Sequence, residues 1–146
     1  MTHTVRRAIA LLPLALPYAC CGLLRHVVSL ETLVRLAWRR PVPAAPNALP
    51  PDAAVVQALA HDVSTISRVV GAAADCLPCS LVIYSRLSKW GADPRLTIGF
   101  SHAAPSLVGH AWVVVDGEAI NEPPDMLATL TPVCVFGPEG RPLRSA

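Results

Sequence analysis

The sequence predicts an α+β fold in which helices precede several strands, two of them joined in a hairpin. Apolar residues recur at steps of three and four between residues 52 and 70, which is the period of a helix with one buried face. After residue 95 several β-rich runs follow, and two of them are joined by Asp-Gly, a strong hairpin signal. The chain has 146 residues, enough for one domain with a modest core and too few for two domains of ordinary size.

Composition divides the chain into three predicted parts. Residues 1–40 form an apolar, basic helical segment, residues 41–51 form a Pro-rich linker, and residues 52–146 form the core. The first 51 residues carry six arginines and only one acid, Glu31. This positive charge comes without interleaved aromatic residues. It therefore fits a membrane surface or an acidic partner rather than nucleic acid.

The apolar run Ala8–Leu24 predicts a helix that docks on the core or lies at a membrane interface. The two arginines before the run and Cys20 near its end resemble a signal peptide or a lipoprotein anchor, but Pro17 fits poorly before a lipid-attachment cysteine. A spanning helix needs about 20 apolar residues. The run is shorter and is interrupted by Pro13 and Pro17, so we do not expect it to span a bilayer.

Two more helices are expected before the cysteine-rich stretch. One covers residues 23–38, where an apolar stripe is predicted at Leu23, Val27, Leu30, Val34 and Ala37. The other begins after Asp52, a plausible N-cap, and ends near Gly71. Its predicted buried stripe consists of Val56, Leu59, Val63, Ile66 and Val70.

Cysteine usage indicates a reducing compartment. The chain has five cysteines and two of them, Cys20 and Cys21, are adjacent, whereas a secreted disulfide framework normally has an even number at wider spacing. We therefore expect a cytoplasmic protein with a peripheral membrane contact through residues 1–40. A zinc site would need a second pair of ligands at short spacing, which the other cysteines and the five scattered histidines do not supply. No metal and no cofactor are expected.

The stretch "DCLPCSLVIYSRL" predicts a helix with Asp75 at its N-cap and Cys76 at its first position. Pro78 falls in the first turn, where its missing N–H costs nothing, and Gly91 is a good stop signal. After this helix, "RLTIGF" at residues 95–100 and "TPVCVF" at residues 131–136 predict strands, and "HAWVVVDGEAIN" between them predicts a hairpin.

Three interpretations of Cys76 are open from its position alone. At the first position of a helix, a sulfur faces unpaired N–H groups and the positive end of the helix dipole, which favours a reactive thiolate. Alternatively, Cys76 is a small buried apolar residue, as many free cysteines are. The spacing of Cys76 and Cys79 also resembles a thioredoxin-type redox pair, but such a pair should follow a buried strand, and here it follows a predicted helix end.

His110 favours the nucleophile interpretation, because it opens the predicted hairpin and has a carboxylate within reach. If residues 115–117 form a three-residue loop, His110 faces Glu122 across the strands. A two-residue Asp-Gly loop would instead place Asn121 opposite Trp112. In the first register an acid lies beside the imidazole, where it would hold the ring tautomer and stabilise its cation. The alternative is a surface histidine near a turn.

The chain resembles the leader-peptide proteases of lasso peptide biosynthesis, which have a transglutaminase-like core within the papain-like cysteine protease group. The resemblance covers about residues 52–136 and rests on "CLPCSLVIYSRLSKWGADPRLTIGF" and "GHAWVVVDGEAINEPPD". It implies that Cys76 is the nucleophile and His110 the base. Glu122 takes the third position, where many members have Asp, and Asn121 is the alternative. Cys79 falls at a variable position of the pattern.

The resemblance implies a function in the maturation of a ribosomally made peptide. The enzyme would hydrolyse one bond of the precursor peptide and release its leader, so that an ATP-dependent lasso cyclase can close the ring. A small leader-binding protein would be the third partner. Two other functions remain open, a thiol–disulfide oxidoreductase that uses Cys76 and Cys79, and a membrane-associated module without activity.

Overall fold

The structure is a computed structural model that describes residues 3–41, 51–70, 75–101, 108–120 and 122–143. Helices α1 (His3–Leu24), α2 (Leu30–Ala37), α3 (Ala53–Val70) and α4 (Cys76–Lys89) precede the sheet. The strands are β1 (Arg95–Ser101), β2 (Val108–Val115), β3 (Glu118–Ala119), β4 (Leu130–Phe136) and β5 (Pro142–Leu143). Two short helices, α5 (Pro124–Leu127) and η1 (Pro138–Gly140), lie before and after β4. The α+β prediction is therefore confirmed, and the two short helices and β5 were not predicted.

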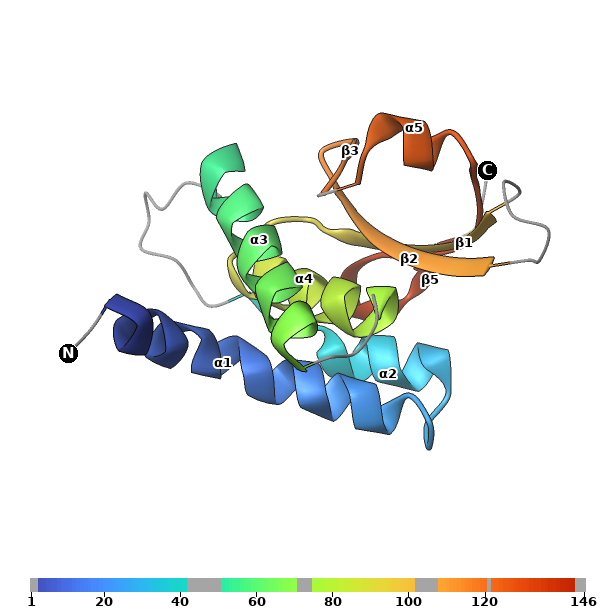
Figure 1. The fold of residues 1–146 in the computed structure, drawn as a ribbon. Coiled ribbons are helices and arrows are strands. Elements are labelled where there is room, and N and C mark those ends of the chain that lie inside the picture. Colours follow the sequence, from blue (N-terminus) through green and yellow to red (C-terminus); the bar gives the residue numbers. More distant parts are fainter. Residues whose placement is uncertain (1–2, 42–50, 71–74, 102–107, 121, 144–146) are drawn as a thin grey trace.

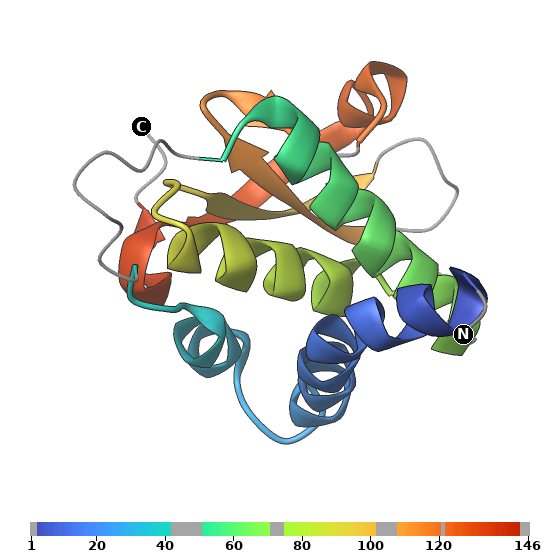
Figure 2. The same ribbon diagram turned by 90° about the vertical axis from the view of Figure 1, so that its left-hand side faces the viewer.

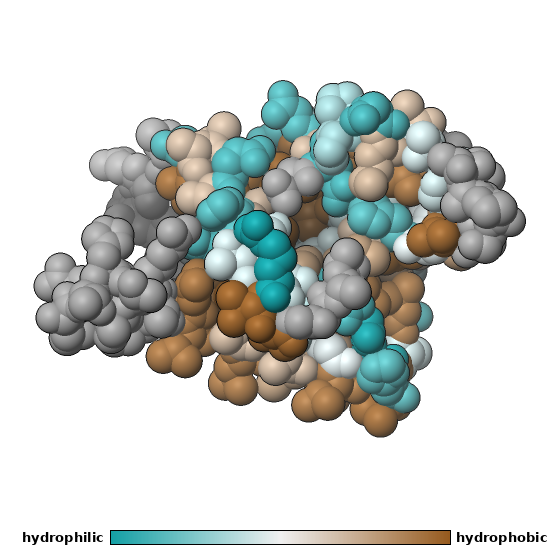
Figure 3. Space-filling model, viewed as in Figure 1, coloured by the Kyte–Doolittle hydropathy of each residue, from teal (hydrophilic) through white to brown (hydrophobic). Residues whose placement is uncertain are grey.

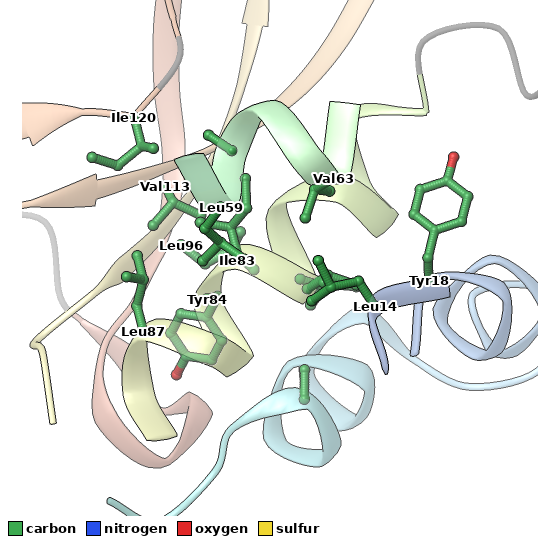
Figure 4. Close-up of a cluster of buried hydrophobic side chains, with 14 of the residues drawn as sticks. Leu14, Tyr18, Leu59, Val63, Ile83, Tyr84, Leu87, Leu96, Val113 and Ile120 are labelled. Carbon is green, nitrogen blue, oxygen red and sulfur yellow. The ribbon is translucent and has the colours of Figure 1, made fainter. Parts of the chain in front are cut away.

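Helix α4 is the centre of the molecule. It lies between the sheet on one side and α1 and α2 on the other, and α3 crosses beside it (Figures 1 and 2). Its apolar residues are buried nearly all round, as expected of a helix enclosed by other elements (Figure 4). The predicted bounds are confirmed, because the helix begins at Cys76 and Gly91 follows its end with a φ of 84°.

The five strands form one antiparallel sheet in the order β3-β2-β1-β4-β5. The central strand β1 pairs with β2 on one side and with β4 on the other, and a bulge between Ile98 and Gly99 shifts the β4 register. Alternate residues of β1 and β2, including Leu96 and Val113, enter the hydrophobic core beside α4. The strands predicted at residues 95–100 and 131–136 are both present.

The predicted start and end of α3 are confirmed, and its predicted buried stripe is corrected at one residue. Asp52 caps the helix, because its Oδ1 accepts a hydrogen bond of 2.8 Å from the Val55 N–H. The buried side is as predicted for Val56, Leu59, Val63 and Ile66. Val70 is 59% exposed, so the predicted stripe is wrong there; it is the last residue of the helix. The next segment, residues 71–74, lies outside the described residues.

The interruption expected from Pro13 and Pro17 does not occur, because α1 runs continuously from His3 to Leu24 with both prolines inside. A proline in a helix leaves the carbonyl four residues before it without its usual N–H donor. For Pro17 that carbonyl belongs to Pro13, and the Arg86 guanidinium of α4 donates to it. A tertiary contact thus satisfies the group that the proline frees.

The single helix predicted over residues 23–38 is wrong, because α1 ends at Leu24 and α2 begins only at Leu30. Ser29 is the N-cap of α2, and its Oγ accepts from the Thr32 N–H at 3.3 Å. The expected stripe survives only in its second half. Val34 and Ala37 are buried, whereas Leu23 and Val27 are more than 70% exposed. The helical period continued through the sequence, but a new cap reset which face is buried.

Tyr84 joins α4 to the turn after β4. Its hydroxyl donates to the Gly137 carbonyl at 2.5 Å and accepts from the Gly140 N–H at 3.2 Å (Figure 4 shows the buried ring). Burial raises the pKa of Tyr84 to about 12, with a smaller opposing effect from the Gly140 N–H. The folded chain thus holds this proton more tightly than the unfolded chain does.

We expect Tyr84→Phe to lower the free energy of unfolding at neutral pH by about 1–3 kcal/mol, because two buried backbone groups lose the hydroxyl and keep only the 3.2 Å bond from the Gly140 N–H to the Gly137 carbonyl. The raised pKa contributes stability that is complete below about pH 10, the ordinary tyrosine value, and is lost as the pH rises toward 12. The difference in the free energy of unfolding between the parent protein and Tyr84→Phe should therefore narrow from pH 8 to 12, as measured by unfolding in urea. Tyr18 is common to both, so its ionisation cancels. A free-energy difference that does not change with pH would contradict this account.

Candidate active site

Cys76 opens α4 and is partly exposed. The first hydrogen bond of the helix runs from the Cys79 N–H to the Asp75 carbonyl at 3.3 Å. The N–H groups of Cys76 and Leu77 therefore precede the intrahelical ladder, and Pro78 has none to satisfy. The start of α4 thus combines a thiol with backbone donors that point along the helix axis.

Asp75 stands at the N-cap, but its side chain makes no capping hydrogen bond. It pairs instead with Arg25, which follows α1 in the sequence. The capping prediction is corrected on this point, since a guanidinium binds a carboxylate more strongly than a neutral amide does. The ion pair ties the α1–α2 connection to the residue before Cys76.

Cys79 belongs to a buried contact rather than to the exposed start of the helix. It packs against the hydrophobic core, and burial raises the pKa of its thiol, partly offset by a hydrogen bond with Ser67 of α3. Ser67 in turn accepts a hydrogen bond of 3.1 Å from the Tyr18 hydroxyl of α1. Cys79 therefore helps to connect α4, α3 and α1 behind Cys76. A neutral, half-buried thiol is a weak nucleophile.

The hairpin after His110 has a two-residue loop, so the three-residue loop used to align His110 with Glu122 is wrong. Val115 pairs with Glu118 and Val114 with Ala119. Between them Asp116 and Gly117 have φ values of 51° and 85°, as a type I′ turn requires. This is the register that would place Asn121 opposite Trp112. Asn121 itself lies outside the described residues.

Glu122 nevertheless lies beside His110. Its Oε1 is 3.0 Å from His110 Nε2, and both side chains are largely buried, with exposed fractions of 16% and 21%. The contact forms because β3 contains only two residues, Glu118 and Ala119, so the chain leaves the ladder before Glu122. A carboxylate at Nε2 keeps the proton on that nitrogen and leaves Nδ1 as the acceptor.

Trp112 is a site residue that the sequence interpretation missed. Its ring stacks on His110 with centroids 6.0 Å apart and an angle of 20° between the planes, and its side chain is buried. Gly99 of β1, the register partner of His110, makes room for it: a Cβ there would lie 2.9 Å from Trp112 Cη2 and 2.4 Å from the Thr131 carbonyl oxygen. Strand alternation could have shown this, because residues two apart share a face.

Ser80 is the second residue that was missed, and it connects the two halves of the site. Its Oγ donates to the Ala111 carbonyl of β2 at 2.8 Å. The next carbonyl on the same side of β2, that of Val113, accepts from the Ile120 N–H at 2.8 Å. Ser80 therefore supplies at Ala111 the hydrogen bond that a longer β3 would have supplied.

This bond brings the start of α4 to the edge of β2 at His110. Cys76 lies one helical turn before Ser80, on the same face, and His110 directly precedes Ala111. The structure joins His110 to Glu122, whereas the described hydrogen bonds include none between the Cys76 thiol and the His110 ring. Such bonds often shorten only when the substrate binds.

We expect Ser80→Ala to reduce the kcat of a reaction that depends on Cys76 several-fold, with little change in KM. The buried Ala111 carbonyl loses its donor, and α4 loses its register against β2. The melting temperature should fall by about 2–6 °C. Ser88→Ala is the matched control: the Ser88 hydroxyl is equally buried but bonds to Tyr84 within α4, at 2.8 Å. It should lower stability without changing kcat. Equal kcat losses in both variants would contradict the role of Ser80.

No metal-binding arrangement accompanies these residues: within the described ranges, no three His, Cys, Asp or Glu side chains gather as ligands would. The candidate residues thus form two groups: the thiol at the start of α4 with the backbone N–H groups that precede the helical ladder, and the His110 imidazole, which the Glu122 carboxylate and the Trp112 ring contact.

The comparison with protein families assigns the chain to a superfamily. The model of the transglutaminase-like superfamily matches residues 20–135, which is most of the chain. No curated protein and no solved structure matches. The superfamily includes cysteine proteases, and its members often have protease or transferase activity. The match begins inside α1 and ends one residue before the end of β4, so it includes every helix and strand from α2 to α5. The chain belongs to the transglutaminase-like superfamily.

Proposed function

We propose that this protein is a cysteine peptidase that removes the leader from a lasso precursor peptide. The observation that carries the peptidase part is the 3.0 Å contact between His110 Nε2 and Glu122 Oε1, at the strand edge that Ser80 ties to the start of α4. A carboxylate on one ring nitrogen has a use in catalysis, because it prepares the other nitrogen to accept a proton.

In the proposed reaction, Nδ1 of His110 takes the proton of the Cys76 thiol, and the sulfur attacks the scissile carbonyl carbon. The N–H groups of Cys76 and Leu77, which precede the helical ladder, would donate to the oxyanion. The imidazolium then gives its proton to the leaving amine, and a thioester remains on Cys76. Water, deprotonated by His110, hydrolyses the thioester and restores the thiol.

The substrate class rests on the motif resemblance, not on the superfamily. The motifs "CLPCS", "RLTIGF" and "GHAWVVVDG" together resemble the lasso leader proteases. On this basis the precursor peptide, a small leader-binding protein and an ATP-dependent cyclase are the proposed partners. The proposed setting is cytoplasmic, where a reduced Cys76 is maintained.

A thiol–disulfide oxidoreductase is the second candidate, since Cys76 and Cys79 share the first turn of α4 and neither is in a disulfide. Two observations favour the peptidase. The helix follows α3 and residues 71–74, without a preceding strand among the described elements, and the His110–Glu122 pair would have no step in dithiol exchange. The third candidate is a module without activity, in which the Cys76–Cys79 and His110–Glu122 pairs would have only a structural role.

The deciding experiment incubates the full chain with the precursor peptide and the leader-binding protein, followed by mass spectrometry. We expect a single cut and a transient product fragment attached to Cys76. Reduction of insulin disulfides by the chain, without peptide cleavage, would favour the redox candidate instead. Absence of both activities would favour the inactive module.

A further inference from the structure

Helix α1 is apolar on two opposite faces. Between Ala8 and Leu24 the sequence has no charged residue. One face is covered, since Leu14 and Tyr18 are buried in the core. The opposite face is not: from Leu11 onward, where side chains are described, the large apolar ones exposed along α1 and the connection to α2 are Leu12, Leu16, Leu23 and Val27, between 64% and 76% exposed. We call these four residues the apolar row.

The apolar row protrudes from the molecule. Leu12, Leu16 and Leu23 are four and seven residues apart, so they lie on one side of the helix, and Val27 continues the row past its end. Figure 3 shows apolar side chains along the lower edge of the molecule, where Figure 1 places α1 and its connection to α2. A helix that is apolar all round is normally covered on every side. An exposed row of this kind is therefore suited to contact with an apolar phase.

A basic cavity lies beside the same helix. It has a volume of about 390 Å³, and Pro17 of α1 forms part of its wall. Its polar lining consists of Arg39, Arg40, Ser85, Arg86 and Lys89. All ten Asp and Glu residues of the chain lie within the described ranges. The ion pairs formed there do not involve the three arginines and the lysine of this lining. The cavity is thus a concentration of positive charge, and no Asp or Glu of the described residues forms an ion pair with it.

We propose that α1 and this basic cavity form a peripheral contact with an anionic lipid surface. The apolar row would enter the boundary between headgroups and acyl chains, and the cavity would receive a lipid phosphate. Among the described residues no helix is long and apolar enough to cross a membrane. The contact proposed here needs only that the helix lie flat, with its buried face on the core.

Charge distinguishes a membrane from a second copy of the chain. A symmetric dimer through the apolar row would bring a second set of uncompensated arginines toward Arg39 and Arg40, and like charges oppose association. An anionic bilayer supplies the opposite charge and the apolar phase together. The row is also a convex line of separate side chains, which suits insertion between lipids.

The test is co-sedimentation of the full chain with vesicles of phosphatidylcholine alone and of phosphatidylcholine mixed with phosphatidylglycerol. We expect binding to the anionic vesicles, weak binding to the neutral ones, and a decrease with added salt. The double variant Leu16→Ser/Leu23→Ser should lose binding at least tenfold. The double variant Arg39→Gln/Arg40→Gln should bind the anionic vesicles about fivefold more weakly for each charge removed.

Two variants serve as matched controls. Val69→Ser removes an apolar side chain that is 80% exposed at the end of α3, and Arg141→Gln removes an exposed cation far along the chain; both should bind as the parent does. All variants should keep the parent's circular dichroism. Equal binding by all of them, or no preference for anionic vesicles, would overturn the proposal. A dimer in light scattering that Leu16→Ser/Leu23→Ser converts to a monomer would assign the row to a second copy instead.

Discussion

Cys76→Ala is expected to abolish leader cleavage, with a loss of about four orders of magnitude or more in kcat, whereas Cys79→Ser should keep most of it. Removing the nucleophile removes the thioester pathway entirely. Cys79 has no step in the reaction, and serine at this position can keep the hydrogen bond to Ser67. Cleavage of the precursor peptide, followed by mass spectrometry under single-turnover conditions, measures both variants.

Folding must be checked before the Cys76 result is interpreted. Cys76 is only partly buried, so the alanine variant should keep the parent's melting temperature within a few degrees and should still bind the precursor. Iodoacetamide should label Cys76 in the parent protein and in Cys79→Ser. If Cys79→Ser were as inactive as Cys76→Ala, and the parent reduced disulfides, the dithiol interpretation would replace the peptidase.

His110→Ala should lower kcat about 10⁴-fold, and Glu122→Gln should lower it about 10²-fold. The kcat of Glu122→Asp should lie between that of the parent protein and that of Glu122→Gln. The imidazole itself moves protons in both halves of the reaction. The carboxylate at 3.0 Å only orients the ring and stabilises its cation, so an amide of equal size keeps the ring in place but loses the charge. Aspartate keeps the charge but does not reach as far.

Steady-state kinetics separate this role from a structural one. A positioning residue should lower kcat with KM nearly unchanged, and its aspartate variant should recover part of the rate. Glu118→Gln, which removes an exposed carboxylate at the start of β3, is the matched control and should behave as the parent does. If Asn121→Ala lost far more activity than Glu122→Gln, the amide would be the third member of the triad.

Most elements of the core could be predicted from the sequence, and three candidate residues, Cys76, His110 and Glu122, were named from it. The helix start at Cys76 and its stop at Gly91 were predicted correctly, as were the strands around residues 95–100 and 131–136. These signals are local: a cap, a proline, a glycine and an alternation of side chains each act over a few residues. They also placed His110 in a hairpin strand, although β2 begins two residues earlier than predicted, at Val108.

Only the tertiary structure decided how the site residues meet. Glu122 was paired with His110 through a wrong loop length, and the contact exists because β3 ends early and a long side chain reaches back. Ser80 and Trp112 were missed, since one bonds to a carbonyl 31 residues away and the other is defined by what stacks on it. Such contacts depend on packing between distant segments, which local periodicity does not encode.

The N-terminal helix shows the same division. Its apolar composition predicted a helix that docks or lies at an interface, and Pro13 and Pro17 predicted an interruption. The helix is continuous because Arg86, a residue of α4, donates to the Pro13 carbonyl that Pro17 leaves free. Sequence determines which backbone groups a proline deprives of a partner. Whether another segment supplies that partner is decided only when the chain has folded, because the donor lies 73 residues away.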